Sequence, residues 1–215
     1  MYRFSWLLLS FLLVFSSCNN EDDQVQDEQT ADSGFFALKV GNKWAYNFFR
    51  VNSQTGELTN LDALEEVEIT QEEVIGQETF FTMKITTSDP NNVCAVCNEE
   101  TTIIKQVKDS LGYLVEVSGP ILFSSESNVD YLIRTEEWGS IYRVLLPNEV
   151  LVDVPAGQFV SKDNQRYAIF PDGERSNGED NLYFAEGIGE IKQTFSGVNS
   201  NRILYEKQLV SYSVE

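Results

Sequence analysis

Hydrophobic and polar residues alternate along much of the chain beyond residue 34. Residues 66–70, for example, read EVEIT. A period of two sends successive side chains to opposite faces of a strand, so this segment has one apolar face and one wet face. Segments of this kind are rich in Val, Ile, Thr, Phe and Tyr, and Gly, Asn, Asp and Pro separate them, which favours strands joined by turns. No segment keeps a strong helical period over the length of an average helix, about 12 residues.

The pattern predicts about ten strands joined by short loops. The candidate segments are residues 43–49, 66–70, 79–86, 102–107, 113–117, 131–134, 141–146, 150–154, 158–170, 182–185, 190–195 and 203–214. We also expect a bulge near residues 163–164, a short helical lead-in over 35–40 and a short turn over 122–128.

Short loops between successive strands make an antiparallel meander, and such a sheet must curl or be covered to hide its edges. The predicted fold class is therefore mainly β: a strongly curved antiparallel meander sheet or open half-barrel with little helix. Apolar residues on its inner face line either a packed core or a ligand cavity.

The first 18 residues have the order of a secretory signal. Arg3 precedes an almost unbroken apolar run, residues 4–15, and the small residues Ser16 and Ser17 precede Cys18. A basic start, an apolar run and small residues are typical of a signal peptide. A transmembrane helix needs about 20 apolar residues, so this run is too short to span a membrane. A plain soluble secretory protein, in turn, needs no cysteine at the junction.

The junction resembles a bacterial lipobox. Phe15, Ser16, Ser17 and Cys18 occupy its last four positions, with Phe15 where Leu is usual, a departure that some Bacteroidetes-type lipoproteins share. The resemblance implies that residues 1–17 are a lipoprotein signal peptide and that Cys18 becomes the first mature residue, carrying lipid such as palmitate. It implies a lipid-anchored protein of the cell envelope, at the outer membrane, on either its periplasmic or its cell-surface face.

Residues 18–34 form the expected tether between the lipid and a single β domain, residues 35–215. The stretch NNEDDQVQDEQTADS at 19–33 has six acidic residues and no basic one. Val25 is its only aliphatic residue besides an alanine, so it cannot bury enough apolar area to fold. Its beginning, NNEDD, resembles the acidic signal that follows the lipidated cysteine of surface-exposed Bacteroidetes lipoproteins. An ordinary solvated linker is the alternative.

The chain is strongly acidic. It has 15 Lys and Arg against 34 Asp and Glu, a net charge of −19. This charge repels phosphate backbones, so nucleic acid is a poor partner. Anionic lipid head groups do not attract it either, so membrane attachment must come from acyl chains. The acidity also keeps an exposed protein soluble.

The chain contains no histidine. That excludes Ser-His-Asp and Cys-His nucleophilic catalysis and most zinc sites. The polar loop at 171–180 carries oxygen ligands of the kind calcium prefers, but its spacing does not match an EF-hand. Glu136 and Glu137 beside Trp138 resemble the paired carboxylates of glycosidases, but an acidic chain provides such pairs by chance. We therefore assign no catalytic residue, no metal and no cofactor, and we expect a non-enzymatic protein.

Cys94 and Cys97 form a CxxC motif in a loop-like context. A redox pair belongs between a strand and a helix, and a zinc site needs further ligands that this chain lacks. The compartment outside the cytoplasm is oxidising. The spacing therefore favours a structural disulfide at a hairpin tip, with free thiols and redox or metal chemistry as the alternatives.

Three strings carry a further resemblance: VGNKWAY at 40–46, VPAGQF at 154–159 and YFAEGIGEIK at 183–192. Together they resemble secreted bacterial lipoproteins, mostly of unknown function, some of which look like the Lol-type lipoprotein carrier, a half-barrel that holds acyl chains. A true Lol carrier covers its sheet with helices, and this chain offers none. The motifs are structural, so no functional residue carries over.

The resemblance implies a membrane-anchored protein whose sheet binds an apolar or amphiphilic ligand, such as a lipid, on its concave face. Trp44, Tyr46 and Trp138 are the candidate aromatics of such a cavity, because ligand pockets need aromatic lining. The alternative is a surface module that binds carbohydrate or protein through exposed aromatics.

Acylation of Cys18 is directly testable. A fatty-acid probe supplied to cells should label the wild-type protein and not the Cys18→Ala variant, because the lipid is expected on that sulfur. Equal labelling of both proteins would refute the anchor.

Overall fold

The structure is a computed structural model that describes residues 34–97 and 101–215. The signal segment, Cys18 and the tether up to residue 33 lie outside the described residues. The residues described all belong to one compact unit. In this part of the chain no helix is long and apolar enough to cross a membrane.

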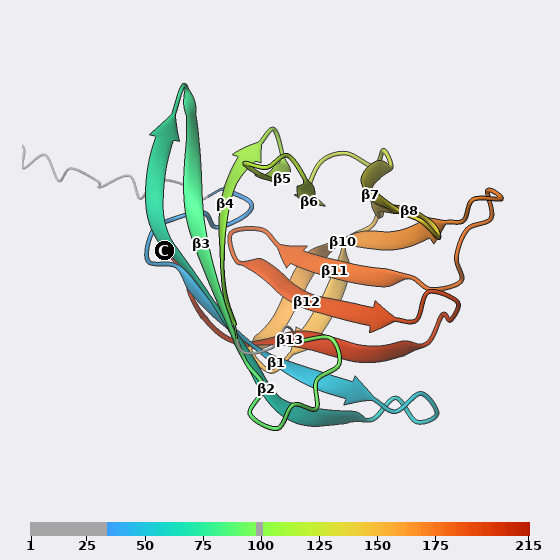
Figure 1. Cartoon of the computed structure of the whole chain (residues 1–215). Helices are drawn as coiled ribbons and strands as arrows, with labels where there is room; N and C mark the ends of the chain where they lie inside the picture. Colours follow the sequence, from blue (N-terminus) through green and yellow to red (C-terminus); the bar gives the residue numbers. More distant parts are fainter. Residues whose placement is uncertain (1–33, 98–100) are drawn as a thin grey trace, which may run out of the picture. The chain divides into compact units, whose positions relative to one another are not determined.

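The described chain folds into thirteen antiparallel strands without a helix, which confirms the predicted fold class (Figure 1). The strands are β1 (Lys43–Val51), β2 (Leu58–Ile75), β3 (Glu78–Ser88), β4 (Thr101–Ser110), β5 (Tyr113–Glu116), β6 (Ile121–Ser124), β7 (Tyr131–Glu136), β8 (Gly139–Leu145), β9 (Val150–Val154), β10 (Gly157–Ile169), β11 (Asp180–Ala185), β12 (Gly189–Ser196) and β13 (Ile203–Ser213).

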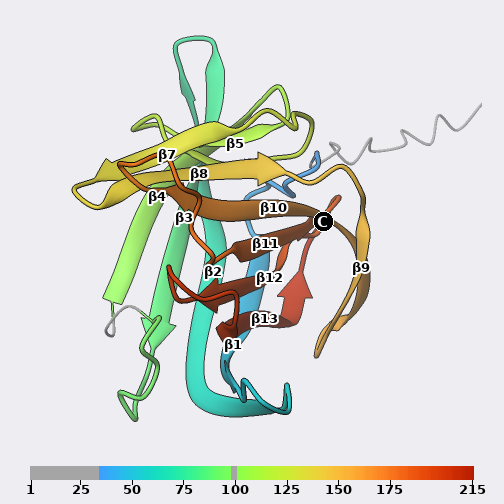
Figure 2. The same cartoon turned by 90° about the vertical axis from the view of Figure 1, so that its right-hand side faces the viewer.

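The strands follow one another almost in chain order around a strongly curved sheet. The order is β6-β5-β4-β3-β2-β1-β13-β12-β11-β10-β8-β7. β9 stands apart from this path and pairs with the first half of β10, as the hairpin in Figure 2 shows. The first and last strands, β1 and β13, pair in the middle of the sheet. The two edges are therefore β6 and β7, which are neighbours in the chain.

The seam between β6 and β7 is closed by a side chain instead of a strand ladder. Asn164, on β10, is fully buried. Its Oδ1 accepts the Ser124 N–H at 2.9 Å, and its Nδ2 donates to the Ser124 carbonyl at 2.8 Å. The Tyr131 hydroxyl also donates to Oδ1, at 3.0 Å. The amide thus does for the β6 backbone what a neighbouring strand would do, because a side-chain amide offers the same donor and acceptor as a peptide unit.

Two cations strengthen the same seam. The Arg143 side chain, from β8, donates to the Leu122 carbonyl. The Lys162 ammonium, from β10, donates to the Ser125 carbonyl at 2.6 Å. Edge carbonyls that would otherwise lack partners are therefore satisfied, which a buried backbone requires.

Three local expectations were wrong. Residues 35–40 form turns, because Gly34 and Ala37 adopt positive φ values of 67° and 52°, which a right-handed helix excludes. Residues 122–128 begin inside a strand, β6. No bulge occurs at residues 163–164: both pair regularly with β11, and residue 164 also pairs with β8. Their polar groups find partners within the fold, so no irregularity is needed to place them.

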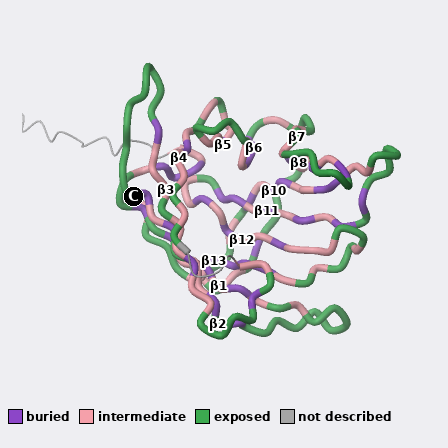
Figure 3. Tube along the Cα trace, in the orientation of Figure 1, coloured by how far each residue is buried: buried purple, intermediate pink, exposed green. Residues whose placement is uncertain are grey.

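β2 is far longer than the expected strand at 66–70. It begins at Leu58, and Asp62 within it has a positive φ of 57°. Because of this break, the alternation of polar and apolar residues cannot be recognised at the start of β2. At its other end β2 continues with β3 into a hairpin that projects as an exposed arm (Figure 3).

The segment before β1 fills one part of the sheet's interior. Phe36, Ala37 and Leu38 are buried there. The Phe36 ring packs edge-on against Phe123 and Phe184, with ring centroids 6.1 and 6.0 Å away. Edge-to-face packing at these distances is a favoured aromatic geometry. The segment therefore ties the β6 side of the sheet to β11.

The loop after β3 fills another part. Cys94 and Cys97 form a disulfide in it. The Asp89 carboxylate accepts the Cys94 N–H at 2.9 Å. The cysteines and Val96 pack against a small apolar cluster that includes Phe48. The disulfide thus stiffens a loop that covers residues of β1, β2, β12 and β13.

We expect Asn164→Ala to destabilise the protein by about 2–4 kcal/mol, because it leaves a buried N–H and C=O of Ser124 without partners. Urea unfolding measures the loss, and hydrogen exchange should rise first in β5 and β6. Asn201→Ala, at an exposed loop position, is the control and should change stability by less than about 0.5 kcal/mol. Equal stability of the two variants would contradict a role for Asn164 in closing the sheet.

Candidate functional site

A cavity of about 310 Å³ lies on the concave side of the sheet. Its lining comes from ten strands and from the segment before β1, which can meet only in the interior. The volume is at the lower end of the range for small-molecule sites, about 300–1,000 Å³. The sheet is therefore not completely filled by its own side chains.

One part of the lining is apolar. Trp44 and Tyr46, which the sequence predicted as cavity aromatics, lie two positions apart on the same face of β1, and both line the cavity. Trp44 Nε1 donates to the Ile188 carbonyl at 2.6 Å, and the Tyr46 hydroxyl donates to the Glu190 carbonyl at 3.1 Å. Because their polar atoms are satisfied by backbone, the two rings can remain buried at no hydrogen-bonding cost. The remaining apolar lining includes Phe36, Leu38, Val67, Leu114, Leu182 and Phe184.

Gly189, at the start of β12, lies against the Trp44 indole. Gly189 has a φ of 100°, where a side chain is strained. A Cβ there would meet Trp44 Nε1 at 3.4 Å, an ordinary van der Waals contact. The backbone conformation of the turn, and not the space beside the indole, therefore favours glycine here.

Another part of the lining is charged. The Lys207 ammonium lies 2.9 Å from a Glu65 oxygen and 2.7 Å from a Glu190 oxygen. It also lies over the Tyr46 ring, 4.8 Å from its centroid. All three charged side chains come from different strands, β13, β2 and β12. Such a buried cluster persists only when its members stay paired.

The electrostatics of this triad follow from burial and pairing. Burial raises the pKa of the Glu190 carboxyl, and the Lys207 ammonium offsets only part of that rise. Burial alone would lower the pKa of Lys207, but the carboxylates of Glu190 and Glu65 outweigh it and raise the pKa. Lys207 therefore stays charged throughout the physiological range, and Glu190 is the group of this triad whose pKa is raised toward it.

Arg143 is the cation of the cavity lining that has no carboxylate within ion-pair distance in the described part of the chain. It is 8% exposed, and its Nε has no hydrogen-bond partner among the described residues. Burial lowers its pKa, and the nearby Tyr131 favours the charged form. The third cation of the lining, Lys105, has a partner in Glu116 at 2.5 Å.

Trp138 lies outside this cavity. It is in the β7–β8 turn, 41% exposed, with its ring 6.4 Å from that of Phe170. It lines a separate depression of about 160 Å³ together with Arg134 and Arg166. Its place in the sequence next to two glutamates gives no indication of which part of the sheet it borders.

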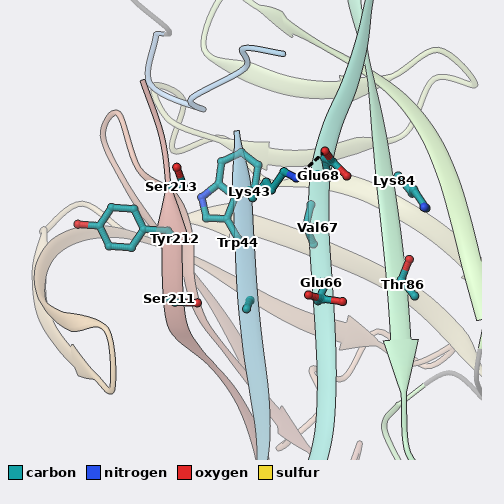
Figure 4. A pocket seen from close by; sticks show the side chains of 11 residues that line it. Lys43, Trp44, Glu66, Val67, Glu68, Lys84, Thr86, Ser211, Tyr212 and Ser213 are labelled. Carbon is teal, nitrogen blue, oxygen red and sulfur yellow. Dashed lines mark ion pairs between the residues drawn. The ribbon is translucent and has the colours of Figure 1, made fainter. Parts of the chain in front are cut away.

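A second groove of about 360 Å³ follows β13, β1, β2 and β3 (Figure 4). Ser211 and Ser213 are small, and the Lys43 ammonium lies 2.9 Å from a Glu68 oxygen. Although its volume is larger, most of the side chains drawn are exposed or half-exposed, and water competes for them. The interior cavity is the better candidate, because desolvated walls bind a ligand more strongly.

Sequence reasoning found the aromatic side of the cavity but missed its charged side. Lys207 lies in the run Glu206-Lys207-Gln208, where three polar residues interrupt an otherwise apolar strand and are all buried. That interruption was the only signal available. Glu65, Arg143 and Glu190 resemble any solvent-facing charge in an alternating strand.

No protein-family model and no curated protein matches the sequence significantly. Two solved structures share the fold. One, from Bacteroides fragilis, is described as exported and YmcC-like in fold; it has a TM-score of 0.52 and 13% identity, and the match covers 84% of this chain and 99% of the other. The second, from Parabacteroides distasonis, is described as a lipoprotein; it has a TM-score of 0.51 and 10% identity, with 84% and 98% covered. At these identities the likeness establishes the fold alone.

We expect Lys207→Met to lose about 3–5 kcal/mol of stability at neutral pH, because it leaves two buried carboxylates without their cation. The Glu190 pKa is already raised, and removal of Lys207 raises it further. A raised folded-state pKa means that stability falls as pH rises, so the variant should recover stability as the pH is lowered. Urea unfolding across the acid range measures this.

Lys43→Met is the matched control, since its ammonium pairs with Glu68 at an exposed position and should contribute less than about 1 kcal/mol. Adding Glu190→Gln to Lys207→Met should restore part of the loss. A double variant as unstable as Lys207→Met alone, or a loss no greater than in Lys43→Met, would count against the buried triad.

Proposed function

We propose that this protein is a non-enzymatic, lipid-anchored lipoprotein of the cell envelope that binds an amphiphilic ligand inside its curved sheet. Two observations support the setting. The N-terminal segment ends in the lipobox-like Phe15-Ser16-Ser17-Cys18. The fold is shared with two proteins of related bacteria, one described as exported and the other as a lipoprotein. Outer-membrane attachment is part of the proposal.

The observation that carries the binding function is the division of the cavity lining into an apolar and a charged part. Phe36, Trp44 and Phe184 belong to the apolar part, and Lys207 and Arg143 to the charged part. An apolar pocket with a few fixed polar groups is the general form of a small-molecule site, in which the walls give affinity and the polar groups fix orientation. An amphiphile offers the same division in one molecule.

The cavity also bears on the resemblance to Lol-type carriers. Such a carrier covers its half-barrel with helices, whereas here the segment before β1 and the disulfide loop after β3 pack inside the sheet. The cavity beside the segment before β1 has about 310 Å³, enough for one short chain and too little for several long ones. We therefore propose a small amphiphile or one acyl chain as the ligand, not a whole lipoprotein anchor.

A surface interaction module is the second candidate. Trp138 is 41% exposed beside Phe170. An exposed aromatic of this kind suits a carbohydrate or protein partner. Such a partner would leave the interior cavity unaffected, so variants of the cavity separate the two functions.

The test uses the full chain, freed of bound lipid, with decan-1-ol, decanoate and decyltrimethylammonium as probes. At least one probe should give a one-to-one complex in native mass spectrometry and raise the Tm by mass action. Met83→Trp places a large ring in the cavity and should weaken binding at least about tenfold by occupying its volume.

Lys84→Trp is the matched control, because the same ring one residue along β3 belongs to the outer groove. Its affinity should equal that of the wild type. If no probe binds the wild-type protein, or if Met83→Trp and Lys84→Trp bind alike, ligand binding in the cavity is excluded.

A further inference from the structure

Arg143 occupies an unusual position for an arginine. It is buried at 8% exposure in the cavity wall, and it reaches the cavity from β8, next to the seam. A guanidinium has five N–H donors and no acceptor. One of its nitrogens donates to the Leu122 carbonyl and the guanidinium also interacts with the Tyr131 side chain, but Nε has no hydrogen-bond partner within the part of the chain that the structure describes. A buried donor of a charged group without a partner is costly, so the native fold leaves a recognition group open here.

The charges around Arg143 leave its guanidinium uncompensated. Glu190 is the carboxylate that favours its charged form, but Glu190 is itself paired with Lys207 at 2.7 Å. Arg166, across the β8–β10 ladder, adds a second positive charge nearby, and its own partner is Asp180. The phenol of Tyr131 also lies beside the guanidinium, and burial raises its pKa to about 12, so it stays neutral. The nearby carboxylates thus pair with other cations, and among the described residues none lies within ion-pair distance of Arg143.

The apolar lining lies within the same cavity. Leu114 and Leu122 contribute to it from β5 and the edge strand β6, and Leu182 and Phe184 contribute from β11. When the head group of an amphiphile lies at Arg143, its alkyl chain therefore lies among these apolar side chains. The Glu190 carboxylate, which also has an oxygen without a hydrogen-bond partner among the described residues, lies 2.7 Å from the Lys207 ammonium and is therefore already matched in charge, whereas Arg143 is not.

From this arrangement we infer that Arg143 recognises the anionic head group, a carboxylate or a phosphate, of the amphiphile bound in the cavity. The inference rests on the proposed function and specifies the chemical class of its ligand. A carboxylate or phosphate oxygen accepts the free N–H groups of a guanidinium in a two-point geometry, which an alcohol or an ammonium group cannot do.

The experiment compares head groups on one chain length. Full-length protein freed of bound lipid is titrated with decanoate, decyl phosphate, decan-1-ol and decyltrimethylammonium, and native mass spectrometry and calorimetry give the Kd values. At least one of the two anions should bind at least about tenfold more tightly than the alcohol, as expected for one additional charge-assisted hydrogen-bonded pair. Which anion binds more tightly distinguishes a fatty-acid ligand from a phosphate-bearing one.

Arg143→Gln should reduce the affinity for the anions to that for the alcohol and leave the alcohol unaffected. Arg134→Gln is the matched control, since that guanidinium is 64% exposed and pairs with Glu136 at 2.9 Å. If Arg143→Gln does not fold, Arg143→Lys replaces it, because lysine keeps the charge but loses the two-point geometry. A fall in anion affinity with unchanged alcohol affinity then supports the inference.

The outcomes separate the inference from the function on which it rests. Equal affinity of the wild type for the alcohol and both anions overturns the role of Arg143 and leaves amphiphile binding intact. A preference for anions that survives in the Arg143 variant overturns it as well. Failure of all four probes overturns the proposed function itself.

Discussion

The closure of the sheet at its β6–β7 seam is the constraint on which the rest of the structure depends. A meander of this length has two edges, and unpaired edge strands bind other chains. Here the edges come from neighbouring segments, and the buried Asn164 amide satisfies both backbone groups of Ser124 at 2.9 and 2.8 Å. Once the edges are held together, the inward faces of strands far apart in the chain enclose one interior. Without that closure the interior would be an open surface and its charges would be hydrated.

The same closure explains why the interior can hold charges. Glu65 and Lys207 are 142 positions apart and meet at 2.9 Å because β1 separates their strands by only one position in the sheet. Ion pairs in such a setting add little net stability, since desolvation of the ions offsets their attraction. We propose that their retention inside a cavity that is otherwise apolar serves ligand recognition. Arg143 connects the two roles, since it donates to the seam at Leu122 and lines the cavity.

The interior is also limited by what the chain places inside it. The segment before β1 buries Phe36 and Leu38, and the disulfide loop brings Cys94 and Cys97 against the Phe48 cluster. In a sheet without helices, these two irregular segments provide the apolar cover that helices provide elsewhere, because an apolar sheet face must pack against something. The cavity of about 310 Å³ is bordered by the first of these segments, through Phe36 and Leu38, and not by the disulfide loop. Its size is therefore limited by the segment before β1 as well as by the curvature of the sheet.

The alternation of residues was enough to predict a mainly β, strongly curved meander and the placement of Trp44 and Tyr46 on one face of β1, because a period of two is a local property of the backbone. The absence of histidine and the CxxC spacing were equally readable. The edge strands, the seam and the charged half of the cavity were not. A charged residue facing a closed interior has the same sequence pattern as one facing water, so Glu65, Arg143 and Glu190 gave no signal. Trp138 is an aromatic residue of the type that lines ligand cavities, and yet it lies outside the cavity, in the β7–β8 turn. Only the tertiary structure decides these cases, because burial is a property of which strands meet and not of the strand that carries the residue.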